Sequence, residues 1–192
     1  MFYDKWGRGR FDAGPFREDI LAAIIKEREY SKIAELGVFD GYTMMTILKD
    51  CPMVEELVGI DTWADPSTYE CLAPKGEKSR LVYETVDHEI NYALTLKNIE
   101  EYKDRYTLLR ITTKEASLLF EDGYFDLVFI DADHSYEGVK QDIIDWSPKV
   151  KVGGSISGHD ISWAGVRQAV QEEIGLERIK IFTDDVWMCE KK

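Results

Sequence analysis

Residues 125–139 have the sequence FDLVFIDADHSYEGV, which passes within a few positions from an apolar run to a cluster of ionisable groups. The apolar run is typical of a buried β-strand, and the residues after it favour a helix. Asp131, Asp133 and His134 therefore lie where a buried strand leads into a helix. Burial penalises charge at such a place unless the charge has a partner. The segment predicts a strand–turn–helix unit that carries functional side chains.

The rest of the chain repeats this alternation, which is typical of a parallel sheet covered by helices. We expect strands at residues 32–38, 54–61, 106–111, 125–131, 149–157, 178–183 and 185–190. We expect helices from Pro15, at residues 42–49, 81–102, 114–120 and 135–146, and through Val166, Val170 and Ile174. The last two strands are joined too tightly for a crossover helix. The predicted fold is a Rossmann-like α/β fold, a seven-stranded mostly parallel sheet with the last strand antiparallel and helices on both faces.

Length and charge narrow the classes of protein. At 192 residues the chain fits one domain, with an N-terminal arm and helix at 1–30 and a cofactor-binding core at 31–192. The net charge of −13 argues against a nucleic-acid or anionic-membrane surface. No apolar segment resembles a membrane span or a signal peptide. Three cysteines without C-x-x-C spacing favour the cytoplasm. We expect a small-molecule partner, and a homo-oligomer stays open.

Polar residues gather where the predicted strands end. Ligands of open parallel sheets bind outside the carboxyl ends of the strands. The residues at these ends are Glu35, Gly37, Asp40, Gly41, Asp61, Thr62, Trp63, Thr112, Thr113, Asp131, Asp133, His134, His159 and Asp160. Solubility alone does not account for so many polar groups on one edge.

The segment around Gly37 and Gly41 favours a ligand-binding turn, with a plain tight turn as the alternative. Glycine lets the backbone approach a ligand closely, and a following helix offers free N–H groups. Phe39 stands where a dinucleotide-binding loop needs its second glycine, which counts against NAD and FAD. Asp61 is placed to accept the hydroxyls of a ribose, or else caps its strand. With Glu35 nearby, the site suits an adenosine that carries a sulfonium and an amino group.

The two histidines at the same edge suggest the catalytic chemistry. His134 is a candidate general base because imidazole titrates near neutral pH. Asp131, His159 and Asp160 form a candidate site for a divalent cation such as Mg²⁺, and hydrogen bonding without metal is the alternative. We take Asp131, His134 and His159 as the catalytic candidates.

Four motifs together resemble a known family. They are ELGVFDG (35–41), GID (59–61), FDLVFIDADHSYEGV (125–139) and GGSISGHD (153–160). The chain is similar over residues 31–190 to class I S-adenosylmethionine-dependent methyltransferases, in particular the small branch of macrolide and aminocoumarin sugar O-methyltransferases.

The resemblance implies roles for individual residues. The first motif, with Glu35, Gly37 and Gly41, would cradle the methionine half of S-adenosylmethionine. Asp61 would hold the ribose, and Thr112 or Thr113 would approach the adenine. Asp40, Thr62, Trp63 and Asp131 complete the expected cofactor-binding set. Asp131 and Asp160 match the magnesium ligands of metal-dependent members, but His159 replaces the usual first acid of the strand-five pair.

These observations predict methyl transfer from S-adenosylmethionine to a small-molecule acceptor, with a hydroxyl favoured by the resemblance. Fold alone does not name the acceptor. One alternative is a non-catalytic module that binds S-adenosylmethionine or serves in assembly, which would bind cofactor tightly without forming product. A further alternative is an NAD-dependent oxidoreductase, which would need the phosphate-binding glycine that Phe39 replaces.

Overall fold

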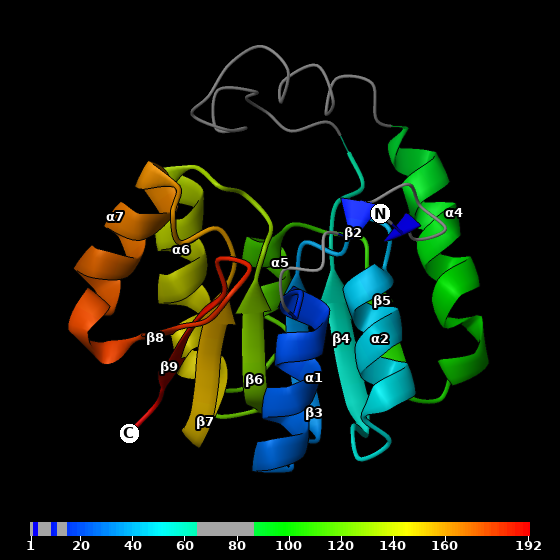
Figure 1. Ribbon diagram of the computed structural model, residues 1–192, viewed down its shortest axis with the longest axis horizontal. Coiled ribbons are helices and arrows are strands. Elements are labelled where there is room, and N and C mark those ends of the chain that lie inside the picture. The colour runs from blue at the N-terminus through cyan, green and yellow to red at the C-terminus, as the bar shows by residue number, and fades with distance from the viewer. Residues whose placement is uncertain (1, 4–8, 11–14, 65–86) are drawn as a thin grey trace.

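The computed structural model describes residues 2–3, 9–10, 15–64 and 87–192, and its centre is one seven-stranded sheet (Figure 1). The spatial order is β5-β4-β3-β6-β7-β9-β8. The strands are β3 (Lys32–Leu36), β4 (Glu56–Ile60), β5 (Tyr106–Leu109), β6 (Phe125–Ile130), β7 (Val150–Gly158), β8 (Lys180–Ile181) and β9 (Trp187–Glu190). Strand β9 runs antiparallel to both of its neighbours, and the other pairs are parallel. The predicted mostly parallel sheet with an antiparallel last strand is confirmed.

Helices cover both faces of the sheet, as predicted. They are α1 (Arg17–Arg28), α2 (Tyr42–Asp50), α4 (His88–Ile99), α5 (Thr113–Ser117), α6 (Tyr136–Trp146) and α7 (Ala164–Glu173). Helices α1 and α2 lie in front of the sheet in Figure 1, and α5 and α6 lie behind it. Successive strand residues point to opposite faces, so Leu127 packs in the layer of α1 and α2 while Val128 packs in the layer of α5, α6 and α7. Burial on both faces explains why β6 is an apolar run.

Three segments differ from the sequence-based expectations. Helix α4 begins at His88, after Asp87 accepts a hydrogen bond from the backbone N–H of Ile90, and residues 81–86 of the expected helix lie outside the described residues. The sequence predicts no strand before residue 32, but β1 (Phe2–Tyr3) and β2 (Gly9–Arg10) form a short antiparallel pair. Strand β8 covers only two residues of the expected 178–183, and the 3-10 helix η4 (Leu176–Arg178) includes the first residue of that range.

The strand register brings the candidate residues to one edge. Leu36, the last residue of β3, pairs with Ile60 on one side and Ile130 on the other. Ile130 in turn pairs with Gly158. The residues that come next, Gly37, Asp61, Asp131 and His159, therefore leave the sheet at the same level. The backbone N–H groups of all four still donate to carbonyls of the neighbouring strands.

Candidate active site

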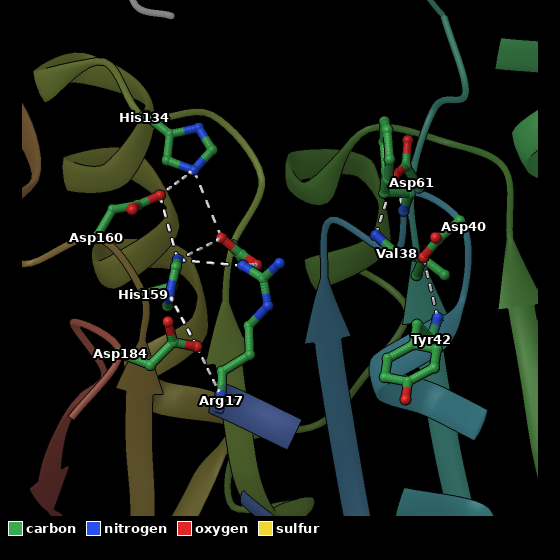
Figure 2. A network of polar contacts seen from close by, with 11 residues as sticks. Arg17, Val38, Asp40, Tyr42, Asp61, His134, His159, Asp160 and Asp184 are labelled. Carbon is green, nitrogen blue, oxygen red and sulfur yellow. Dashed lines mark hydrogen bonds and ion pairs between the residues drawn. The ribbon is translucent and has the colours of Figure 1, made fainter. Parts of the chain in front are cut away.

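Two groups of polar residues flank the end of the sheet (Figure 2). The first surrounds the glycine-containing loop between β3 and α2, and includes Val38, Asp40 and Asp61. The second lies at the ends of β6 and β7 and includes His134 and His159. We call the first the loop site and the second the Asp–His site.

Gly37 joins the two sites because the loop backbone runs directly over the end of β6. Its φ of +86° lies in the left-handed region. A Cβ on Gly37 would overlap with the carbonyl oxygen of Asp131. Gly41 also has a positive φ, of +74°, and a Cβ there would crowd Thr95 on α4. Both glycines are therefore required by the path of the loop.

Asp61 ties this loop to the end of β4. Its Oδ2 accepts hydrogen bonds from the backbone N–H groups of Val38 and Phe39, both at 2.9 Å. Its Oδ1 accepts from the N–H of Trp63 at 2.8 Å. A carboxylate has about four lone-pair positions, so these three bonds leave little capacity for a further donor. Asp61 thus organises the loop, and its contact with a ribose stays a prediction.

Trp63 packs beneath the surface and supports the loop between β3 and α2. Its side chain is only 2% exposed, and its Nε1 donates to the carbonyl oxygen of Phe39 at 2.8 Å. Its ring packs against Tyr92 of α4. Phe39, by contrast, is 45% exposed. Thr62, the residue before Trp63, is also exposed. Asp40 accepts a hydrogen bond from the backbone N–H of Tyr42 at the start of α2.

Thr112 and Thr113 form hydrogen bonds within and beside α5. Thr112 caps α5 and exchanges hydrogen bonds with Glu115. The hydroxyl of Thr113 donates to Oδ1 of Asp142 on α6 at 2.6 Å. Burial raises the pKa of Asp142 to about 7. Both threonine hydroxyls are therefore engaged with neighbouring carboxylates, and the approach of Thr112 or Thr113 to an adenine stays a prediction.

The Asp–His site brings four predicted residues together. Nε2 of His134 lies 2.8 Å from Oδ2 of Asp160 and 3.5 Å from Oδ1 of Asp131. Nδ1 of His159 lies 3.3 Å from Oδ2 of Asp160 and 3.6 Å from Oδ1 of Asp131. Asp160 has a φ of +55°, a strained conformation for a residue other than glycine. Such strain concentrates at functional sites.

Charge coupling in the Asp–His site is strong. Burial lowers the pKa of His134, but hydrogen bonds with Asp131 and Asp160 outweigh burial and raise this pKa to about 9. Burial raises the pKa of a carboxyl group, yet the contacts with the two histidines hold the pKa of Asp160 well below its ordinary value. At neutral pH the resting site therefore contains a protonated His134 against an ionised Asp160.

Arg17 is a member of the Asp–His site that sequence analysis missed. Its Nη1 donates to Oδ2 of Asp131 at 2.9 Å and lies 3.1 Å from Nδ1 of His159. The backbone N–H of Arg17 donates to Oδ2 of Asp184, in the turn between β8 and β9 (Figure 2). A cation in the first turn of a helix opposes the helix dipole and so favours a negative neighbour, but the sequence does not show which residue provides it.

Glu35 lies buried beside both sites. The residue is 2% exposed, and its Oε2 has no hydrogen-bond partner among the described residues. Burial, and then the nearby charge of Asp131, raise the pKa of Glu35 well above its ordinary value, while Arg17 opposes this shift. A buried carboxyl oxygen without a partner is costly, and indicates a place where a bound group completes the site.

The residues that share a possible metal centre differ from those predicted. Within the described part of the chain, the grouping is Asp131, His134 and Asp160, whose candidate ligand atoms all lie within 4.8 Å of one another. His159 instead lies against Arg17. Mg²⁺ prefers an oxygen-rich shell, whereas here an imidazole enters the set and a guanidinium already binds one carboxylate. As arranged, these residues do not fit a magnesium ion.

A family model for a methyltransferase domain matches residues 34–161, which contain the loop site and the aspartates and histidines of the Asp–His site but not Arg17. The chain belongs to this methyltransferase family. The match begins within β3, runs through β7 and ends one residue after Asp160. The predicted class I methyltransferase fold is thus confirmed, and the NAD-dependent oxidoreductase is disfavoured.

Individual relatives agree with this assignment. Tricin synthase 1 of Oryza sativa subsp. japonica is 26% identical over 166 residues, which are 86% of this chain, and the chain spans only 59% of that relative's length. The O-methyltransferase of Bacillus cereus, solved with SAH, superposes with a TM-score of 0.62 at 14% identity, over 95% of this chain and 84% of the other. A TDP-rhamnose 3'-O-methyltransferase of calicheamicin biosynthesis superposes with a TM-score of 0.56 at 13% identity. The superposition covers 89% of this chain and 77% of the other. Among the described helices of this methyltransferase-family chain, none has the length and apolar character needed to cross a bilayer.

Proposed function

We propose that the chain transfers a methyl group from S-adenosylmethionine to a hydroxyl group of a small molecule. The observation that carries this proposal is the packing of Gly37 on the backbone of Asp131. It sets a loop suited to the methyl donor directly beside a cluster suited to the acceptor. Methyl transfer is an in-line displacement, so holding donor and acceptor side by side supplies much of the rate.

The loop site fits the chemistry of the donor. S-adenosylmethionine supplies an activated methyl group on a positively charged sulfur, together with an ammonium and a carboxylate. The partnerless Oε2 of Glu35 suits a cationic group, which would also favour ionisation of this carboxyl. At the start of α2 the N–H of Tyr42 donates to Asp40, and the remaining N–H groups of this helix end would receive the carboxylate of the donor.

The Asp–His site fits an acceptor hydroxyl. The backbone of Asp131 lies next to Gly37, and the side chains of Asp131 and His134, 3.5 Å apart, would offer an acceptor and a donor of hydrogen bonds to the hydroxyl. In its neutral form His134 would accept the proton that the hydroxyl loses, and Asp160, which His159 also contacts, would orient the imidazole. The sequence predicts a divalent cation at Asp131, His159 and Asp160, and turnover in a chelator tests that prediction.

The names of structural neighbours support a hydroxyl acceptor, and the free cysteines support a cytoplasmic setting. The two structural neighbours described above are O-methyltransferases by name, and one acts on a nucleotide-linked sugar. Cys51 and Cys189 are buried free thiols, which suits a reducing compartment. The homo-oligomer and the absence of a nucleic-acid partner remain predictions.

The test uses S-adenosylmethionine with a deuterated methyl group and pools of hydroxylated small molecules, including phenols and nucleotide sugars. Mass spectrometry should detect one product that carries the label, together with S-adenosylhomocysteine. Tight binding of S-adenosylhomocysteine without any labelled product would favour the non-catalytic module. No binding at all would refute the proposed function.

A further inference from the structure

We propose that Arg17 supplies the positive charge at the Asp–His site that a divalent cation would otherwise bring, so that methyl transfer by this chain needs no metal ion. The inference rests on the proposed function for its catalytic consequence. Its structural part, the occupation of the candidate metal centre by a guanidinium, can be tested without turnover.

The first step is the position of the guanidinium. Nη1 of Arg17 lies 2.9 Å from Oδ2 of Asp131, a carboxylate that belongs to the candidate metal centre. The same nitrogen lies 3.1 Å from Nδ1 of His159. A divalent ion bound by Asp131 would therefore face a fixed positive charge within a few ångströms, in a partly buried place where charges repel strongly. Binding of the ion would require Arg17 to leave.

The second step is that Arg17 is held in place. Its backbone N–H donates to Oδ2 of Asp184 at 2.8 Å, and the hydroxyl of Thr183 donates to the carbonyl of Pro15 at 3.2 Å. Both acceptor and donor come from the turn between β8 and β9. The apolar side of α1, including Leu21 and Ile25, is fully buried against the sheet. The hydrogen bonds to the β8–β9 turn and the packing of α1 on the sheet together hold the first turn of α1 at the Asp–His site.

The third step is the use of this charge. Oδ2 of Asp131 accepts a hydrogen bond from Arg17, and Oδ1 of Asp131 lies near the rings of His134 and His159. The guanidinium therefore fixes the orientation of the carboxylate of Asp131, the residue whose backbone borders Gly37. It also places a positive charge near the position where negative charge develops on the acceptor oxygen. A preorganised charge of this kind stabilises the transition state as a bound cation would.

The experiment measures Mn²⁺ binding by electron paramagnetic resonance and methyl transfer in the presence of a chelator. The variants are Arg17→Ala and Arg17→Lys, and the control is Arg28→Ala. Arg28 lies at the other end of α1 and pairs with the exposed Glu190. Circular dichroism and thermal unfolding check that each variant folds.

We expect wild type and Arg28→Ala to keep full activity in chelator, Arg17→Ala to lose at least about tenfold in kcat, and Arg17→Lys to fall between them. Arg17→Ala should bind Mn²⁺ at least about tenfold more tightly than wild type, because the competing charge is gone. Equal Mn²⁺ affinity of the two proteins would overturn the proposal. So would loss of wild-type activity in chelator, or an Arg17→Ala variant as active as Arg28→Ala. The Mn²⁺ comparison decides on Arg17 even if no methyl acceptor is found, which separates its failure from failure of the proposed function.

Discussion

The α-carbon of Gly37 faces the carbonyl of Asp131 so closely that no side chain fits between them. This contact joins the loop after β3 to the end of β6, and thereby the loop site to the Asp–His site. The geometry follows from register, since Leu36 pairs with Ile130 and the next residue of each strand leaves the sheet at the same level.

Gly37→Ala should weaken binding of S-adenosylhomocysteine at least about tenfold, because the added Cβ pushes the loop from Asp131 and strains a positive φ. We expect the free energy of unfolding to fall by about 1–3 kcal/mol. The control is Gly123→Ala, which also has a positive φ but has open space around its Cβ. Calorimetry and chemical denaturation measure the two effects, and equal affinity in both variants would contradict this account of the loop.

Asp61→Ala should disorder the same loop, because three backbone N–H groups lose their acceptor. We expect affinity for S-adenosylhomocysteine to fall at least about tenfold, with a cost in stability of about 1–3 kcal/mol. Asp50→Asn, at the exposed end of α2, is the control. Calorimetric affinity that stays unchanged in Asp61→Ala would refute both the anchoring and the ribose assignment.

The rate of methyl transfer should rise with pH. If neutral His134 accepts the proton, kcat/KM follows the neutral fraction, which grows as pH rises towards the His134 pKa of about 9. The increase should approach about tenfold per pH unit below pH 8 and level off above pH 9. His134→Gln should be slow and lack this slope, while His88→Gln on α4 should retain it. A flat wild-type profile between pH 6 and 9 would remove His134 as the base.

Asp142→Asn should stabilise the protein at alkaline pH. The pKa of Asp142 is raised to about 7 in the folded chain, so the folded state binds a proton that the unfolded state has lost above its ordinary pKa of 3.8. Stability from this group is full below pH 3.8 and is lost as pH rises through 7. At pH 8 the variant should gain on the order of 2–4 kcal/mol over wild type, and this gain should shrink towards pH 4.

Denaturant titrations across this pH range measure the effect. The matched control is Asp122→Asn, an exposed carboxylate paired with Lys149, for which a change within about 1 kcal/mol is expected. A pH-independent difference between Asp142→Asn and wild type would mean that Asp142 is ionised in the folded chain.

The sequence predicts the location of those site residues that directly follow a strand. Parallel strands end at one edge, so Asp131, His134, His159 and Asp160 were expected together and are together. The direction in which a side chain points is harder to predict from the sequence. A sequence cannot tell a tryptophan that supports a loop from one that faces a ligand, and Trp63 is the supporting kind.

Arg17 escaped prediction because its position depends on tertiary docking. Helix α1 reaches Asp131 across 114 positions of sequence, through hydrogen bonds to a turn near the C-terminus. No local pattern encodes that contact. The start of α4 was accessible in principle, since Asp87 is a strong N-cap residue, but the i+4 apolar spacing before it extended the expected helix.

The central claim is that Glu35, Gly37 and Asp131 border one pocket for the methyl donor, next to His134. A crystal structure with S-adenosylhomocysteine at saturating concentration tests it most directly. We predict density for the ligand along the Gly37 loop, with its amino group on the side of Glu35 and its sulfur towards Asp131. An empty loop, or ligand bound elsewhere on the sheet, would contradict the claim.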